Sequence, residues 1–313
     1  MKQRRFIVLS ATLLVLIVIT LIATLSEDKK AAGNFSSSLV DLDPGKVSVI
    51  TFTPPGGSGA FELVKAEGGE WKLVTDGKEY VAGERQVDQL LGSIGDITAT
   101  QVVARDSDAW GEYHVNDSLG TLLALKEGDD LLASVVVGRI SFSQSRNPYQ
   151  QQPDMFTFLR QGSDATVYKV KGMLSMQVSG GVNSFRSGVI TDMPKALLQE
   201  AVFSYPADSS YVLTRRDSIW DMGGMQPDSA SLATYLTNLT GFSSRSFVDT
   251  GVPTGAPAFS IQLKGTDMAS VEVRAWTAEE QHLVTSSQNP GSVFRLEEEQ
   301  FERLFRGKGW LSR

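Results

Sequence analysis

One order of landmarks occurs twice in this sequence, and it constrains the fold more than any other feature. Each copy opens with aromatic and apolar residues in strand-like spacing and reaches a tryptophan after nearly the same interval. The landmarks are Phe52, Pro54, Phe61, Leu63 and Trp71 in the first copy, and Phe203, Pro206, Tyr211, Leu213 and Trp220 in the second. Self-similarity of this kind predicts two related structural units.

A helical stripe follows each tryptophan after a polar turn. Apolar residues recur at i, i+3, i+4 and i+7, which predicts an amphipathic helix packed on a core. They are Val87, Leu90, Leu91 and Ile94 in the first copy, and Leu232, Tyr235, Leu236 and Leu239 in the second. Asp228 or Ser229 is expected to cap the second helix. Trp71 and Trp220 are expected to be buried opposite these helices, whereas a sugar-stacking surface would need them exposed.

The remainder of each copy has short strand patterns separated by polar turns. The expected strands are 101–104, 122–126, 133–137, 155–159 and 166–170 in the first copy, and 246–249, 259–264, 270–274, 283–285 and 292–296 in the second. Phe301, Leu304 and Phe305 predict a closing helix. Because helices do not alternate with single strands, we predict an α+β fold: an N-terminal transmembrane helix and two repeated units (46–193 and 194–313), each a mainly antiparallel sheet with one or two packed helices.

Residues 6–25 form an uncharged and largely apolar run behind a cationic stub, residues 1–5. A helix of this length spans about 30 Å, the thickness of the hydrocarbon core of a bilayer. A cleaved signal peptide has a shorter apolar region, of about 7–15 residues, before a site of small residues. We therefore predict a retained anchor in the lipid bilayer, followed by a spacer over 26–45. Cleavage is the alternative.

The cationic stub also sets the expected orientation. The positive-inside rule keeps Lys2, Arg4 and Arg5 in the cytoplasm. We therefore expect a single-pass protein of the inner (cytoplasmic) membrane whose C-terminal bulk is extracytoplasmic, on the periplasmic side. Without these three cations the 29 Lys and Arg fall to 26 against 36 Asp and Glu, a net charge of −10. Such an acidic exterior argues against nucleic acid as a partner.

Seven short and mostly apolar motifs lie in order along the first copy. They span residues 61–65, 70–74, 87–94, 110–115, 135–138, 167–170 and 185–186. In this order they resemble DUF4340, a domain-of-unknown-function family of bacterial envelope proteins, and the second copy matches more loosely. A proline that usually follows the 110–115 step in the family is missing here. The resemblance implies an N-terminal anchor, an extracytoplasmic role and a link to ABC-type transport systems of the gliding-motility auxiliary kind. It implies no catalytic residues.

Residues that could carry catalysis are few and dispersed. His114 and His282 lie in different copies, and neither belongs to a His-Glu-x-x-His zinc motif. No Gly-x-Ser-x-Gly nucleophile elbow occurs. The absence of cysteine excludes thiol catalysis and thiolate metal sites. We therefore predict no catalytic residue, no cofactor and no metal site.

Residues 143–154 form a long, polar, proline-bearing segment that has no counterpart in the second copy. Long loops without secondary structure of their own often carry function. The alternative is a connection without a function. The candidate interaction residues are Arg146, Asn147, Pro148, Tyr149 and Gln150.

Three functional hypotheses follow. The favoured one is a membrane-anchored, extracytoplasmic envelope protein with a non-catalytic interaction or scaffolding role, accessory to an ABC-type transport system. The second is an exported module that binds a glycan or peptide. The third, and least favoured, is a hydrolase, whose sign would be a hydroxyl or carboxylate within hydrogen-bond reach of a histidine.

Overall fold

A computed structural model describes residues 37–310, with the exception of 41, 144–152, 163, 252, 279 and 280. The expected anchor at 6–25 and the candidate interaction residues at 146–150 lie outside this part of the chain. Among the residues described, no helix has both the length and the apolar character needed to cross a bilayer.

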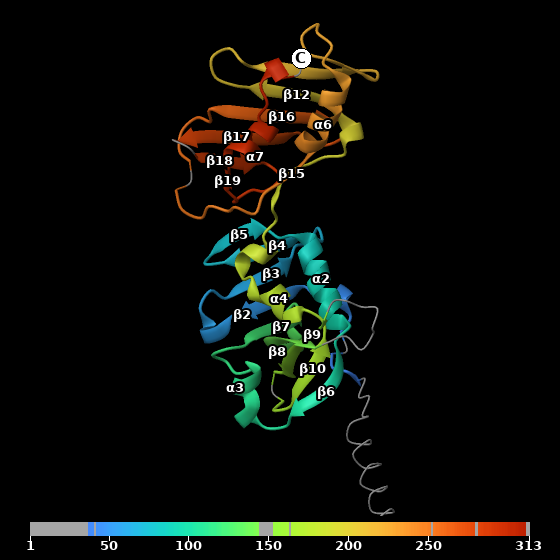
Figure 1. The fold of residues 1–313 in the computed structure, drawn as a ribbon, viewed down its shortest axis with the longest axis vertical. Coiled ribbons are helices and arrows are strands. Elements are labelled where there is room, and N and C mark those ends of the chain that lie inside the picture. Colours follow the sequence, from blue (N-terminus) through green and yellow to red (C-terminus); the bar gives the residue numbers. More distant parts are fainter. Residues whose placement is uncertain are drawn as a thin grey trace, which may run out of the picture.

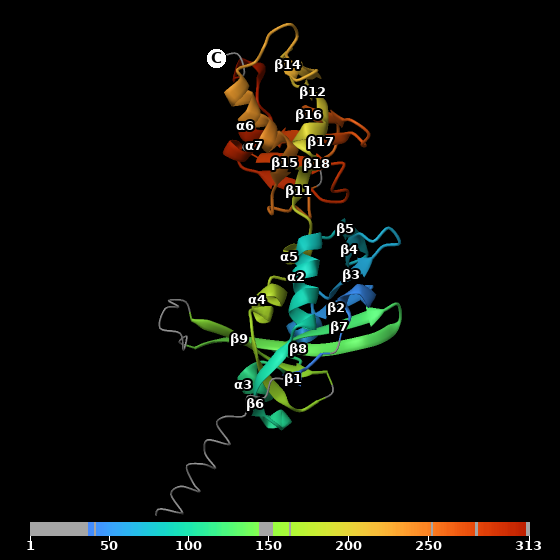
Figure 2. The same cartoon turned by 90° about the vertical axis from the view of Figure 1, so that its right-hand side faces the viewer.

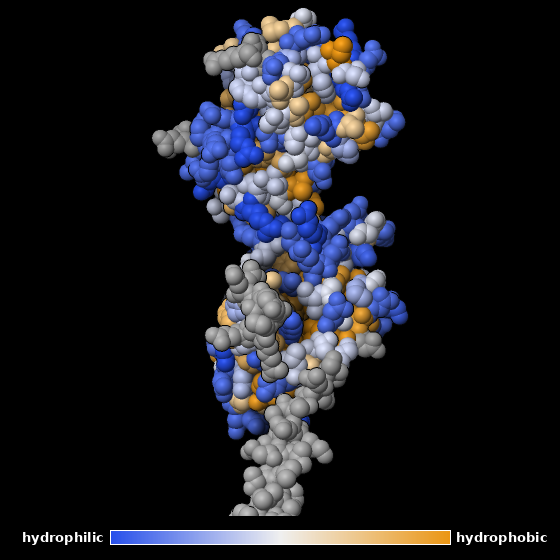
Figure 3. Space-filling model, turned by 45° about the vertical axis from the view of Figure 1, so that its right-hand side comes forward, coloured by the Kyte–Doolittle hydropathy of each residue, from blue (hydrophilic) through white to orange (hydrophobic). Residues whose placement is uncertain are grey.

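The described chain forms two units arranged end to end along the long axis of the molecule (Figure 1). Each consists of an antiparallel sheet with a few helices, so the predicted α+β class is confirmed. On the face shown in Figure 3, hydrophilic residues separate the apolar ones into patches.

A ten-stranded sheet organises the first unit, in the order β1-β6-β10-β9-β8-β7-β2-β3-β4-β5. Its strands are β1 (Ser37–Ser38), β2 (Val49–Thr53), β3 (Phe61–Lys65), β4 (Trp71–Thr75), β5 (Lys78–Val81), β6 (Thr98–Ala104), β7 (Thr121–Glu127), β8 (Asp130–Ser143), β9 (Asp154–Gln161) and β10 (Val167–Lys171). The β8–β9 hairpin extends sideways from the rest of the unit (Figure 2).

The helices of the first unit are α2 (Glu84–Gly95), α3 (Trp110–Tyr113), α4 (Leu174–Ser179) and α5 (Val182–Phe185). All four predicted stripe residues of α2 are buried in the core. Burying four such side chains contributes roughly 6–12 kcal/mol before the entropy of ordering is subtracted. This burial, rather than a capping side chain, holds α2 on the sheet, because its N-cap is Gly83.

A seven-stranded sheet organises the second unit, in the order β14-β13-β12-β16-β17-β18-β19. Its strands are β12 (Leu198–Ser204), β13 (Tyr211–Arg216), β14 (Ile219–Asp221), β16 (Phe259–Gly265), β17 (Val271–Ala278), β18 (Gln281–Ser286) and β19 (Phe294–Leu296). A separate pair, β11 (Val189–Asp192) and β15 (Gly241–Ser243), lies next to the junction with the first unit. The helices are α6 (Ser229–Thr240) and α7 (Glu298–Leu304). Asp228 caps α6, as predicted, by accepting the N–H of Ser231 at 2.8 Å.

The two sheets share one strand order when β2, β3, β4 and β7 are matched to β12, β13, β14 and β16, and β8–β10 to β17–β19. The aromatic landmarks pair in the same way. Phe52 stacks on Phe61 with ring centroids 4.3 Å apart, and Phe203 stacks on Tyr211 at the same distance. Both pairs are direct cross-strand neighbours, so the matching spacing in the sequence corresponds to matching contacts.

The predicted strand at 246–249 is wrong. Phe247 forms only an isolated bridge with Phe294, and the regular strand of this region is β15, earlier in the chain. The side chain of Asp249 is bound by Arg186. The segment therefore touches the edge strand β19 at one bridge and also contributes Asp249 to the junction.

Candidate ligand pocket and the junction between the units

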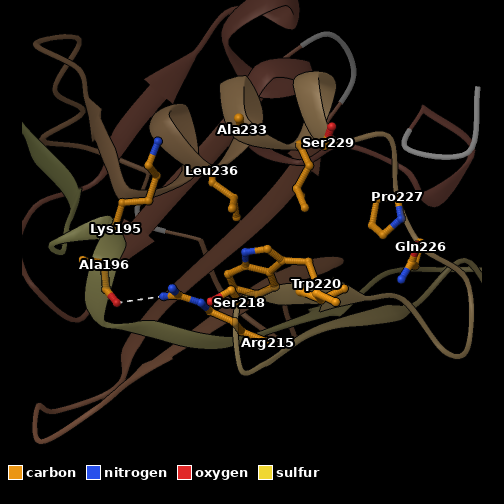
Figure 4. A pocket seen from close by; sticks show the side chains of 12 residues that line it. Lys195, Ala196, Arg215, Ser218, Trp220, Gln226, Pro227, Ser229, Ala233 and Leu236 are labelled. Carbon is orange, nitrogen blue, oxygen red and sulfur yellow. Dashed lines mark hydrogen bonds between the residues drawn. The ribbon is translucent and has the colours of Figure 1, made fainter.

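A pocket of about 500 Å³ lies in the second unit between α6 and the sheet edge formed by β13 and β14 (Figure 4). The 3-10 turn η4 (Lys195–Leu197) borders one end, and the segment leading into α6 borders the other. The volume falls within the range of small-molecule sites, about 300–1,000 Å³. A second hollow, of about 540 Å³ and beside Leu39 and Leu131, has no charged side chain in its lining.

The apolar part of the pocket comes from α6 and β14. Leu232 and Leu236 belong to the predicted stripe of α6 and are buried. Between them and the sheet lies the indole of Trp220, which is only half-buried and occupies the middle of the view in Figure 4. Pro227 extends the apolar surface toward the start of the helix. The pocket therefore has a flat aromatic wall opposite an aliphatic one.

The polar part of the pocket is concentrated at its two ends. At the η4 end, Lys195 Nζ donates to Thr237 Oγ1 at 3.2 Å, and Arg215 Nη1 donates to the carbonyl of Ala196 at 2.9 Å. Neither cation forms an ion pair within the described residues. Gln226 and Ser229 lie at the other end (Figure 4). The two cationic side chains are therefore positioned by hydrogen bonds to uncharged oxygen atoms.

A difference between the two hairpins accompanies the pocket. In the first unit, the carbonyl of Trp71 accepts the N–H of Ala82 at 3.0 Å, which closes the hairpin of β4 and β5. In the second unit the hairpin is shorter, and the bridge between Met222 and Met225 places Pro227 opposite Trp220. Proline has no N–H to donate. A main-chain hydrogen bond like the one from Ala82 to Trp71 in the first unit is therefore impossible between Pro227 and Trp220 in the second.

The two tryptophans consequently differ in burial. Trp71 is 5% exposed, so its predicted core position is confirmed. Trp220 packs against the second core but is only partly buried and lines the pocket, so its predicted core position is confirmed in part. A shorter interval to the helix and a proline before the cap were the sequence signals of the difference.

Arg186 lies at the junction of the units and is 2% exposed. Its guanidinium carbon lies 3.9 Å from the ring centroid of Tyr80 in the first unit and 4.1 Å from that of Phe247 in the second. Nη1 donates to Asp249 Oδ1 at 2.7 Å, and Nη2 donates to Ser292 Oγ at 3.3 Å. One side chain is thus sandwiched between rings of both units.

A second close approach supports this junction. Gly291 has a φ of 83°, and a Cβ added there would lie 2.9 Å from the carbonyl oxygen of Glu79 in β5. A larger residue at Gly291 would be strained and would push the units apart. The β5 strand of the first unit therefore lies directly against a turn of the second.

Arg160 is a second buried arginine, within the first unit. Its Nε donates to the carbonyl of Val115 at 2.8 Å, and its guanidinium lies 3.9 Å from the ring centroid of Trp110. Burial lowers the pKa of Arg160, and the nearby Asp117 carboxylate partly counteracts this. These contacts hold the turn at 110–117, which contains one of the family-like motifs, in place.

His282 has the contacts that would have been the sign of a hydrolase. Its Nδ1 lies 3.1 Å from Thr277 Oγ1 and its Nε2 lies 2.8 Å from Glu298 Oε2. However, the imidazole is buried and stacked on Phe301 at 3.7 Å, whereas the Glu298 side chain is 69% exposed. A catalytic triad has the reverse arrangement, with a buried acid behind an accessible base. The contacts instead fasten α7 to the β17–β18 hairpin.

The other candidate groups are not brought together. His114 is exposed, in a left-handed conformation at the end of α3, in the unit that does not contain His282. Among the described residues, no three His, Asp or Glu side chains are grouped so that they could hold a metal ion.

These features define a class: an α+β protein of two like-ordered antiparallel sheets, joined at a buried arginine and carrying a pocket on one of them. Residues 71–258, more than half of the chain, match the family described as "Domain of unknown function (DUF4340)". The chain belongs to this family. Comparisons with curated proteins and with solved structures give no match.

Proposed function

We propose that this protein is a non-catalytic interaction protein of the cell envelope, anchored in the inner membrane by residues 6–25 and accessory to an ABC-type transport system. In this proposal the described units lie on the extracytoplasmic side. The family supplies the suggested transport context, and the cationic stub before an apolar run supplies the suggested address.

The junction at Arg186 is the observation that carries the proposal. The guanidinium contacts rings of both units, so the two units meet at a specific junction. The first described strand, β1, lies near the end of the first unit that is remote from the second unit (Figure 2). An anchor preceding β1 would therefore present the second unit at a distance from the bilayer, where a partner can reach it.

Affinity purification of the full-length protein from detergent-solubilised membranes tests this function. We expect subunits of an ABC-type transport system to be recovered in stoichiometric amounts, and less of them with Arg186→Ala. Arg216→Ala, a change at an exposed arginine that does not lie at the junction, serves as the matched control. Recovery of the bare protein from wild type and variants alike contradicts the proposal.

The proposed address has its own test. Protease added to intact spheroplasts should digest the units that follow the anchor. Protection in intact spheroplasts, with digestion after lysis, would place them in the cytoplasm.

A second candidate function is an exported ligand-binding module, and the pocket beside Trp220 favours it. An aromatic wall, an aliphatic wall and a few polar groups at the ends are the usual composition of a small-molecule site. Once a ligand has been identified, loss of its binding in a Trp220→Ala variant that remains folded would support this candidate function.

A further inference from the structure

We infer that the pocket between α6 and β14 binds a carboxylated sugar, with the sugar ring against Trp220 and its carboxylate at Lys195 and Arg215. The inference rests on the second candidate function, the ligand-binding module, and specifies its ligand.

The aromatic wall argues for a ring with one apolar face. Trp220 presents a flat indole to the pocket, Leu236 faces it from α6 (Figure 4), and Leu232 also lines the pocket. The C–H face of a pyranose is apolar and flat, so it can cover an indole while its hydroxyl groups point sideways. The half-exposed indole of Trp220 is accessible to such a ring, whereas the buried Trp71 of the first unit is not.

The charges at one end argue for an anionic substituent. Arg215 and Lys195 each have one neutral oxygen partner, and neither has an ion pair within the described residues. Each therefore keeps N–H groups available for a ligand. A guanidinium binds a carboxylate through two parallel hydrogen bonds, which are stronger than bonds between neutral groups. In a chain with a net charge of −7, two unpaired cations at one pocket end mark a local preference for anions.

The opposite end argues for hydroxyl groups rather than a purely aromatic acid. Gln226 and Ser229 offer an amide and a hydroxyl there, and Ser218 adds a hydroxyl near the aromatic wall. These groups can both donate and accept, as sugar hydroxyls require. A volume of about 500 Å³ leaves room for one or two sugar rings.

Isothermal titration of the full chain in detergent with D-glucuronate, methyl glucoside and phenylacetate tests the inference. Glucuronate should bind most tightly of the three probes. Arg215→Gln should weaken glucuronate binding at least about tenfold, the loss expected for a charge-assisted hydrogen bond, and should leave methyl glucoside unchanged. Trp220→Ala should weaken both sugars.

The matched control is Arg216→Gln, because neighbouring residues of a strand point to opposite faces of the sheet and Arg216 does not line the pocket. This variant should bind glucuronate as the wild type does. A cooperative thermal unfolding transition above the titration temperature confirms that each variant is folded, with a lower transition expected for Trp220→Ala.

The outcomes separate the inference from the function on which it rests. Equal binding of methyl glucoside and glucuronate overturns the acidic specificity but keeps the ligand-binding module. Tighter binding of phenylacetate overturns the saccharide class and also keeps the module. If no probe binds at concentrations up to about 10 mM, the inference is wrong and the second candidate function loses its support.

Discussion

In both units a helix packs against a hairpin at one edge of the sheet, but the packing is closed in the first unit and leaves a pocket in the second. In the first unit, Trp71 is buried and the hairpin of β4 and β5 is closed by the N–H of Ala82. In the second, Pro227 occupies the matching place, the hairpin is shorter, and Trp220 lines a pocket. Strand order and aromatic pairs are otherwise alike. The comparison teaches that a local change in one hairpin can open a site without altering the sheet beneath it.

The largest expected effect comes from replacing the two tryptophans with alanine. Trp71→Ala removes a fully packed side chain and should cost about 3–5 kcal/mol of unfolding free energy. Trp220→Ala should cost only about 1–2 kcal/mol, because that indole is only partly buried against the second core. Denaturant unfolding gives both values. Equal losses would mean that helix and hairpin pack alike in the two units and that the pocket is closed in solution.

Removing the junction arginine should have the next largest effect. Arg186→Ala should cost about 2–3 kcal/mol, because it leaves a cavity between two rings and removes the hydrogen bonds to Asp249 and Ser292. Asp249→Asn keeps the ring contacts and should cost less. Hydrogen exchange should show faster exchange on both sides of the junction in the first variant. A change confined to one unit would contradict the proposed coupling.

Alkaline pH should destabilise the second unit more than the first, and this difference should be smaller than the effects above. Burial raises the pKa values of Tyr205, Tyr211 and Tyr235 in the second core. In the first unit, burial raises that of Tyr168, a less enclosed residue. A raised tyrosine pKa means that the folded state retains protons that the unfolded state releases. The stabilisation is therefore complete below about pH 10 and is lost as the pH rises further.

We accordingly expect the second unit to unfold first above about pH 10, as measured by hydrogen exchange or limited proteolysis. Earlier unfolding of the first unit would show that these tyrosines do not control alkaline stability.

Two tyrosine-to-phenylalanine changes should have the smallest effects and opposite signs. Tyr235 donates to the carbonyl of Leu304 at 2.9 Å, so Tyr235→Phe should cost about 1 kcal/mol. Within the described residues the buried hydroxyl of Tyr205 has no hydrogen bond of good geometry, although the hydroxyls of Tyr211 and Tyr235 are close enough to influence it, so Tyr205→Phe should be neutral or slightly stabilising. Thermal unfolding measures both. A clear loss for Tyr205→Phe would show that its hydroxyl has a partner in solution.

Much of the fold could be predicted because it depends on local periodicity. The stripes of α2 and α6 are buried as their spacing predicted, and Asp228 caps α6. The predicted strand at 246–249 is reduced to a single bridge between Phe247 and Phe294, because a strand-like pattern does not show how far a distant partner strand will pair with it. For the same reason Arg186, although part of a family-like motif, could not be recognised as a junction residue.

The order of apolar and aromatic residues by itself determined two related units, each a mainly antiparallel sheet with a packed helix, because alternation and helical spacing show which face of each strand or helix is buried. The order of the strands within each sheet came from the tertiary structure. Only the tertiary structure decided which cation lies between the units and which tryptophan remains accessible. Those outcomes depend on residues far apart in the chain, such as Tyr80, Arg186 and Phe247, and on a hydrogen bond that Pro227 cannot make. Contacts of this kind leave no regular spacing of residues in the sequence, because they form only when distant parts of the chain come together on folding.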